Sequence, residues 1–150
     1  MKYRTRAVAA AALTIAATLT APGTAAADSP SADGPTITVT IRNETDAPMV
    51  LTSKDNPYGS WVDEPATVVP ARSSETVSAS SSDRRGFGVQ VDYTMPGDAT
   101  VTLMANNYGT GVANGDGTHI DGANRHGYAV EARVDAGYPF MAADFAVAPR

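Results

Sequence analysis

The densest group of side chains that could carry out chemistry lies between residues 114 and 127. This stretch contains both histidines of the chain, His119 and His126, together with Asp116, Asp121 and four glycines. Imidazole and carboxylate groups bind transition metals, and carboxylates with backbone carbonyls bind calcium. The spacing, however, matches neither an EF-hand nor a zinc protease helix, and Gly and Asn favour turns. We therefore favour a flexible hairpin loop with two surface histidines over a metal site, and we expect no cofactor.

The groups that a hydrolase needs are not assembled in this sequence. Serines are frequent in the range 73–82, but no Gly-x-Ser-x-Gly nucleophile elbow is present. Asp63 and Glu64 are adjacent, so on an extended chain their carboxylates point to opposite faces instead of flanking one bond. Both histidines belong to the same glycine-rich stretch. The sequence therefore predicts a protein that is not an enzyme.

Aromatic side chains outside the regular segments are the remaining candidates. Trp61, the only tryptophan, and Tyr58 lie in one polar loop, while Tyr108 and Tyr138 stand beside Asn, Gly or Pro. Rings with a polar edge suit a membrane interface or the face of a sugar. The alternative for Trp61 is a cap on one end of the core, which is favoured for a lone tryptophan in a small domain. Our candidate ligand-binding residues are Trp61, Tyr58 and Tyr108.

The first 27 residues have the features of a secretory signal. They carry three basic residues and no acidic one, followed by an apolar stretch at 7–20 and the small residues Ala25-Ala26-Ala27. The apolar stretch is too short for a membrane span, and Pro22-Gly23 follows it closely. We expect cleavage after residue 27, a disordered leader at 28–35, and a secreted domain at 36–150 with no transmembrane segment.

The charge of the chain excludes several functions. The whole sequence has 150 residues and a formal charge of −5, and removing the predicted signal leaves 123 residues with eight basic and 16 acidic side chains, a charge of −8. An acidic chain of this size is a single domain that lacks the positive charge needed to bind nucleic acid or to adsorb to anionic lipid. The absence of cysteine excludes disulfides and zinc–thiolate sites.

Alternating apolar and polar residues predict an all-β domain. The clearest alternation occurs at 36–42 and 87–93, and the turn 96–98 joins the second of these to 100–103 as a hairpin. Further short strands are expected at 49–52, 66–69, 76–80, 127–134 and 140–147. No window shows a capped helical stripe. About eight short strands separated by turns predict an antiparallel β-sandwich or jelly roll.

The order of features from residue 37 to residue 93 resembles a known family. A strand over 37–43 is followed by Gly59-Ser60-Trp61, a serine-rich run to Ser82, and the strand Gly86-Phe87-Gly88-Val89-Gln90-Val91-Asp92-Tyr93. This order, over about half of the mature chain, is similar to that of the first half of aegerolysins and their bacterial crystal-toxin-like relatives. The second half lacks the further tryptophans common in that family.

The resemblance implies an acidic, actinoporin-like β-sandwich that recognises membrane lipid and, in some members, forms pores with a second, larger protein. It implies lipid contacts at Trp61 and Tyr58, to which we add Tyr108 from its position. We therefore predict a secreted, non-enzymatic sandwich that binds membrane lipid. The alternatives are an inhibitor or other protein-binding module, and a carbohydrate-binding module that uses the same aromatic residues with calcium.

Overall fold

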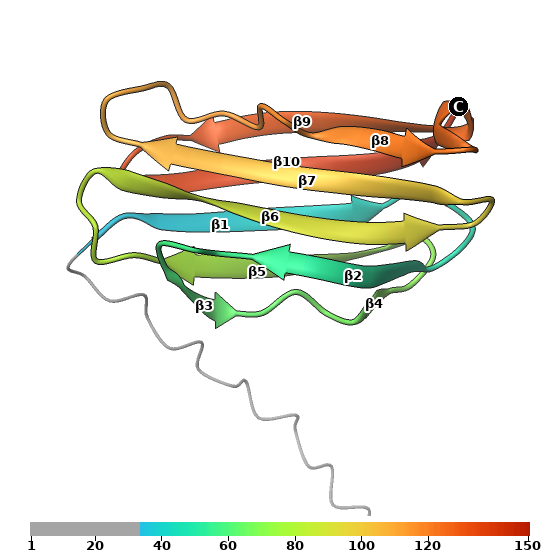
Figure 1. Ribbon diagram of the computed structural model, residues 1–150, viewed down its shortest axis with the longest axis horizontal. Helices are drawn as coiled ribbons and strands as arrows, with labels where there is room; N and C mark the ends of the chain where they lie inside the picture. The colour runs from blue at the N-terminus through green and yellow to red at the C-terminus, as the bar shows by residue number, and fades with distance from the viewer. Residues whose placement is uncertain (1–33) are drawn as a thin grey trace, which may run out of the picture.

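Two five-stranded sheets pack face to face in this protein (Figure 1). The structure, a computed structural model, describes residues 34–150, so the predicted signal at 1–27 and most of the predicted leader at 28–35 lie outside the described residues. The only helical element in the described range is a short 3-10 turn, η1 (Arg125–Gly127). The all-β sandwich predicted from the alternating pattern is confirmed.

Both halves of the chain contribute strands to each of the two sheets. The first sheet contains, in spatial order, β3 (Ser60–Asp63), β5 (Ser73–Ser80), β1 (Thr36–Asn43), β10 (Phe140–Pro149) and β9 (Tyr128–Ala136). The second sheet contains β4 (Val68–Val69), β2 (Met49–Asp55), β6 (Gly86–Met95), β7 (Ala99–Tyr108) and β8 (His119–Gly122). All neighbouring strands are antiparallel except one pair, β1 and β10.

The parallel pair β1 and β10 departs from the antiparallel sheet that the sequence predicts. The two strands run in register from Thr36 opposite Phe140 to Asn43 opposite Val147. Local alternation indicates that each segment is a strand, but it carries no information about which distant strand becomes its neighbour. The pairing places the start of the domain beside its last strand.

The core lies between the sheets and follows the predicted alternation. Every second residue of β6 and β7 is buried, as in the clear alternation at 87–93. The largest fully buried side chains include Tyr93, Phe87, Phe145, Ile37 and Ile41. Tyr93 donates a hydrogen bond to Glu75 on the opposite sheet. Burial first, and this hydrogen bond second, raise the pKa of Tyr93 far above its ordinary value, so its hydroxyl remains protonated.

Three local expectations differ from the structure. Residues 119–122, expected within a loop, form the edge strand β8, because Thr102 to Ala99 of β7 offer them an unpaired edge. Trp61, expected in a loop, belongs to β3, where it pairs with Ala79. The strands number ten in the described range instead of about eight, since the edges of both sheets carry short strands. No helix in residues 34–150 is long and apolar enough to cross a membrane.

Candidate functional site

Exposed apolar side chains gather at one end of the sandwich. Of the seven large hydrophobic residues that are exposed in the described chain, five come from loops or strand ends that meet there. We call this region the aromatic end: Tyr58, Tyr108, Val112, Tyr138 and Phe140. The registers place these residues together, because β7 ends opposite the start of β6 and β10 begins beside the start of β1. The end lies at the left of Figure 1.

The exposure of these side chains is large. Val112 is 84% exposed, Tyr58 is 67% exposed and Phe140 is 62% exposed. The other two exposed apolar residues, Val50 and Val68, pair with each other on β2 and β4, towards the opposite end of the sandwich. Single exposed apolar residues are common on soluble proteins, whereas several at one end of a domain make that end a candidate binding surface.

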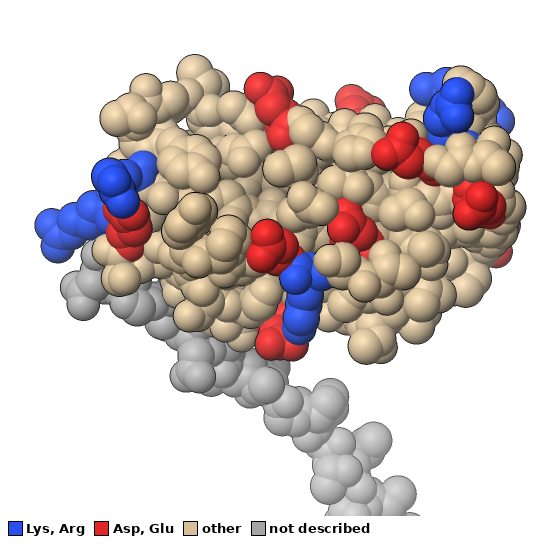
Figure 2. All heavy atoms as spheres, in the orientation of Figure 1, with Lys and Arg blue, Asp and Glu red and all other residues tan. Residues whose placement is uncertain are grey.

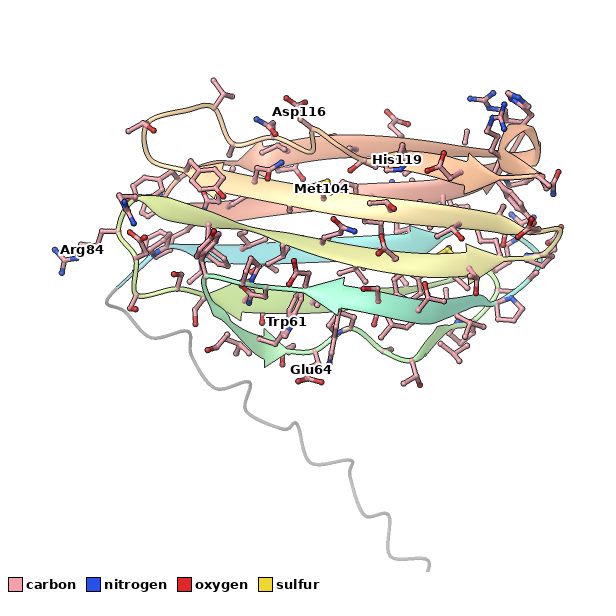
Figure 3. All side chains as sticks on the ribbon, viewed as in Figure 1. Trp61, Glu64, Arg84, Met104, Asp116 and His119 are labelled. Carbon is pink, nitrogen blue, oxygen red and sulfur yellow. The ribbon has the colours of Figure 1, made fainter. Side chains whose placement is uncertain are left out.

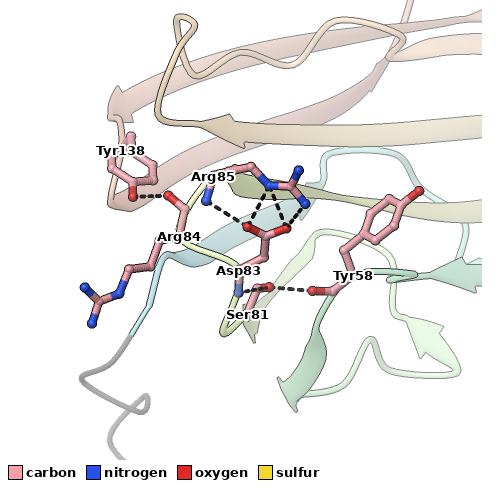
Figure 4. Close-up of polar contacts among 6 residues, drawn as sticks. All are labelled: Tyr58, Ser81, Asp83, Arg84, Arg85 and Tyr138. Atoms are coloured by element: carbon pink, nitrogen blue, oxygen red, sulfur yellow. Dashed lines mark hydrogen bonds and ion pairs between the residues drawn. The ribbon is translucent and has the colours of Figure 1, made fainter.

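The loop between β5 and β6 joins the other loops of the aromatic end (Figure 4). The Ser81 hydroxyl donates to the carbonyl of Tyr58, and the Tyr138 hydroxyl donates to the carbonyl of Arg84 at 2.5 Å. The backbone N–H of Gly109 donates to the carbonyl of Arg85 at 3.0 Å. Three separate loops are therefore hydrogen-bonded to one central loop, which holds their aromatic side chains in a defined arrangement.

Two further contacts hold the loop between β9 and β10. A Cβ atom built on Gly109 would lie 3.1 Å from the ring of Tyr138, so glycine permits the close approach of that ring. Below it, the side chain of Asn107 is completely buried and donates to the carbonyls of Thr36 at 2.8 Å and Pro139 at 2.9 Å. These buried hydrogen bonds hold Pro139, which precedes Phe140, close to Thr36, the residue that pairs with Phe140 on β1.

The aromatic end is less acidic than the rest of the domain. Residues 34–150 carry eight basic and 14 acidic side chains, a charge of −6. The four loops at 56–59, 81–85, 109–113 and 137–139 contain one acidic and two basic residues, a charge of +1. In Figure 2 uncharged residues cover much of this end, beside a few charged side chains. A negatively charged surface is therefore not repelled by the loops themselves.

Asp83 and Arg85 account for most of the charge in the central loop. The Arg85 guanidinium contacts the Asp83 carboxylate at 2.8 Å, and the Arg85 backbone N–H donates to the same carboxylate at 2.9 Å. These hydrogen bonds, from the side chain first and the backbone second, lower the pKa of Asp83 to about 2. The pair leaves Arg84 as the loop's remaining cation, and Figure 3 shows its side chain pointing away from the domain.

Tyr58 and Tyr108 border a shallow depression of about 160 Å³ on the outer face of the second sheet. Asp55, Gln90 and Asn106 also line it. Gly88 also lines it, and a Cβ atom there would lie 2.8 Å from the Asn106 amide oxygen, so glycine permits the close approach of that side chain. The depression therefore combines two rings with several hydrogen-bonding groups, an arrangement that suits a small polar ligand with an apolar face.

The structure brings together two of the three residues that the sequence selected. Tyr58 and Tyr108 share the depression, whereas Trp61 is half-buried on β3 and packs against the core. Figure 3 shows Trp61 along the lower edge of the sandwich. This location matches the alternative in which Trp61 packs against the core, and a ligand contact for Trp61 stays a prediction.

Three residues of the aromatic end were not selected from the sequence. Tyr138 is noted in the sequence for its position beside Gly137 and Pro139, but it is not among the three selected candidates. Phe140 begins a strand and Val112 follows a glycine-rich turn. Their exposure results from strand pairing and loop direction, which alternation does not reveal.

The histidine-rich stretch is divided between two elements. In β8 the His119 ring contacts the Gly117 carbonyl at 2.6 Å and the Asp121 carboxylate at 2.9 Å, and these contacts, the first being stronger, raise the pKa of His119. His126 lies in η1. The backbone N–H of Asp116 donates to the side-chain oxygen of Asn114, within the loop that precedes β8. Within residues 34–150 no group of three or more His, Cys, Asp or Glu side chains is arranged to hold a metal ion.

Comparison with known proteins identifies a shared fold. The sequence matches no protein-family profile and no curated protein. Among solved structures, the chain is similar to the crystal structure of the lipid binding protein Nakanori, with a TM-score of 0.64, 6% sequence identity, and coverage of 77% of this chain and 71% of that one. At this level of identity the similarity shows that the two chains share an all-β fold.

Proposed function

We propose that this protein binds membrane lipid through its aromatic end and acts without enzymatic activity. The single observation that carries the proposal is the gathering of five exposed apolar side chains on four hydrogen-bonded loops at one end of the sandwich. The shared fold with a protein described as lipid binding supports it. We also propose that the protein is related to the aegerolysins, which its sequence resembles, and that it acts as one component of a pore-forming toxin.

The energetics of such an interaction are adequate. Transfer of a large apolar side chain from water to a non-polar environment is worth about 1.5–3 kcal/mol, and partial insertion into an interface is worth a fraction of that. Five such side chains presented by fixed loops give reversible membrane binding without a large ordering cost. The acidic body does not prevent this, because the charged groups on the far strands lie well beyond the screening length of about 8 Å at physiological salt.

The proposal also concerns location. The predicted export signal at 1–27 places the domain outside the cell that makes it, where it meets the outer surface of membranes. Outer leaflets are richer in neutral headgroups than the anionic cytoplasmic leaflet. A loop surface with aromatic rings and a charge of +1 is suited to such headgroups.

Co-sedimentation with vesicles tests this function. The wild type and the double variant Tyr58→Ser/Phe140→Ser are each incubated with three kinds of vesicle. These consist of phosphatidylcholine, of sphingomyelin with cholesterol, and of phosphatidylcholine with phosphatidylserine. We expect at least one composition to retain the wild type, and the variant to bind about tenfold more weakly. The matched control Val50→Ser/Val68→Ser, which removes the exposed apolar pair at β2 and β4, should bind like the wild type. Retention of the aromatic variant at wild-type strength, or failure of all vesicles to retain the wild type, contradicts the proposal.

The depression beside Tyr58 and Tyr108 favours a second candidate, the binding of a sugar ring. Aromatic faces with neighbouring carboxylate and amide groups are suited to stacking and hydrogen bonding to a sugar. A glycan array separates the candidates. Saturable binding of a free oligosaccharide that Tyr108→Ala abolishes, without retention on any glycan-free vesicle, would assign the site to carbohydrate.

A further inference from the structure

Two neighbouring arginines of this acidic domain form no ion pair with the side chains that the structure describes. Five of the eight basic side chains in residues 34–150 contact a carboxylate: Arg42, Lys54, Arg72, Arg85 and Arg133. Arg84, Arg125 and Arg150 have no such contact within the described range. In a domain with 14 carboxylate side chains, a guanidinium group that contacts none of them is free to bind an anion from outside the domain. Arg84 stands alone at the aromatic end, whereas Arg125 and Arg150 lie beside each other at the opposite end.

Backbone hydrogen bonds place these two arginines next to His126. We call Arg125, His126 and Arg150 the basic turn. The N–H of Arg150 donates to the carbonyl of Gly127 at 3.0 Å, which extends the pairing of β10 with β9 by one residue. The N–H of Gly127 donates to Asn124 at 3.0 Å and closes the 3-10 turn. Figure 2 shows basic side chains gathered at the upper right, over the end of β10 and η1.

The basic turn is anchored to the turn between β6 and β7. The N–H of Asn124 donates to the carbonyl of Asp98 at 3.3 Å, and the Tyr128 hydroxyl donates to the carbonyl of Pro96 at 3.1 Å. The Tyr128 bond connects the first sheet to the second, and the Asn124 bond holds the residue before η1 to the same turn. The backbone that carries Arg125 and His126 is therefore held in place before any ligand arrives, which lowers the ordering cost of binding.

The side chains of the basic turn line an open cavity of about 330 Å³. His119 lies at its rim, and Ile120, Tyr128 and Val130 form its apolar wall. No Asp or Glu side chain of the described residues lines this cavity, whereas the cavity bordered by Arg42 and Arg133 on the outer face of the first sheet also contains three carboxylate side chains. The nearby Asp121 contacts His119 at 2.9 Å. Two guanidinium groups and an imidazole therefore line a concave surface to which no side-chain carboxylate contributes.

We propose that the basic turn binds an oxyanion, specifically a phosphate group or its sulfate analogue. The planar guanidinium donates paired hydrogen bonds that match the geometry of phosphate oxygens, and two of them next to an imidazole provide donors for a doubly charged group. The apolar wall would contact the organic part of a phosphorylated ligand. A single carboxylate would use fewer of these donors.

This inference goes beyond the proposed function because the two sites lie at opposite ends. The ten-residue strand β7 runs from Ala99, near the basic turn, to Tyr108 at the aromatic end, a span of about 30 Å. A domain that rests on a membrane through the aromatic end would point the basic turn away from that membrane. The phosphate then belongs to a soluble ligand or to a second surface.

Titration of the full chain with inorganic phosphate, in a buffer free of phosphate and sulfate, tests the proposal by NMR. Saturable shifts should appear at the backbone amides of residues 124–128 and 150. The double variant Arg125→Gln/Arg150→Gln should bind phosphate about tenfold more weakly or not at all. The control Arg84→Gln removes the third arginine without a carboxylate partner and should bind phosphate like the wild type. Sulfate should compete with phosphate.

The outcomes separate the sources of the ligand. Vesicles of phosphatidylcholine with phosphatidic acid are offered to a protein carrying Tyr58→Ser/Phe140→Ser, so that the aromatic end does not contribute. Retention that depends on Arg125 and Arg150 assigns the phosphate to a lipid, and phosphate binding without retention assigns it to a soluble ligand. Absence of saturable binding, or equal binding by the double arginine variant and the wild type, overturns the proposal whether or not the wild type binds neutral vesicles.

Discussion

The two ends of the sandwich use the same strands in different ways. At the aromatic end, loops present large apolar side chains to solvent, and their polar groups serve mainly to hold the loops to one another. At the opposite end, turns are short and polar, and the exposed side chains include the basic turn. The difference shows that one sandwich core can carry two unrelated surfaces, because the exposed side chains of the loops do not take part in the packing between the sheets.

A buried asparagine stabilises each end. Asn43, at the end of β1, donates to the carbonyls of Ala47, Val69 and Pro70 at 2.8–3.1 Å. It also accepts hydrogen bonds from the backbone and hydroxyl of Thr45 at 3.0 Å and 2.7 Å. Asn107, at the aromatic end, donates two. The end that carries the basic turn is therefore held by the larger network of hydrogen bonds, around Asn43, and the aromatic end by the smaller one, around Asn107.

The largest expected effect concerns these two asparagines. Asn43→Ala leaves several buried groups without partners and should lower the free energy of unfolding by about 4 kcal/mol, whereas Asn107→Ala should lower it by about 2 kcal/mol. Urea unfolding followed by circular dichroism measures both. At temperatures where both variants are folded, only Asn107→Ala should weaken vesicle retention. An equal loss of binding in both variants would remove the distinction between the ends.

A matched pair of valines tests the surfaces themselves. Val112→Ser, at an 84% exposed position of the aromatic end, should weaken vesicle binding about fivefold, because one apolar side chain no longer inserts. Val68→Ser, at a 43% exposed position on β4, should leave binding unchanged. Co-sedimentation over a range of vesicle concentrations, with both variants at wild-type stability, gives the comparison. A larger loss for Val68→Ser would place the binding surface elsewhere.

Tyr138→Phe tests whether the loops of the aromatic end are held together. The variant keeps the ring but loses the hydrogen bond to the carbonyl of Arg84, which is worth about 1 kcal/mol. We expect faster hydrogen exchange at the amides of residues 81–86 and 109, with unchanged exchange at residues 124–128. Exchange that accelerates equally at both ends would mean that the bond contributes to global stability instead.

The smallest effect is the pH dependence contributed by His119. Its pKa is raised above the ordinary 6.5, so the folded protein favours the protonated ring. The resulting stability is fully present below pH 6.5 and is lost as the pH rises through the folded pKa. The side chain is half-exposed, so the effect should be about 0.3 kcal/mol. Melting temperatures of the wild type and His119→Gln should differ more at pH 5.5 than at pH 8.5, and a reversed difference contradicts this assignment.

Much of the fold could be predicted from local pattern. Alternation at 36–42 and 87–93 corresponds to β1 and β6, and the turn at 96–98 joins β6 to β7 as expected. The edge strands β3 and β8 were not predicted, because they are short and are formed by pairing with a neighbouring strand. Of the candidate site, Tyr58 and Tyr108 could be selected as aromatic residues next to turn residues.

The sequence by itself determined that the domain is an acidic all-β sandwich with aromatic rings on its loops, since composition and period-two alternation are local properties. Only the tertiary structure decided that Phe140 and Val112 lie at the same end as Tyr58, that Trp61 packs on the core, and that Arg125 and Arg150 line one cavity without a side-chain carboxylate. These juxtapositions depend on the parallel pairing of β1 with β10 and on the antiparallel pairing of β10 with β9. Such pairings join segments remote in sequence, and strand alternation alone does not specify them.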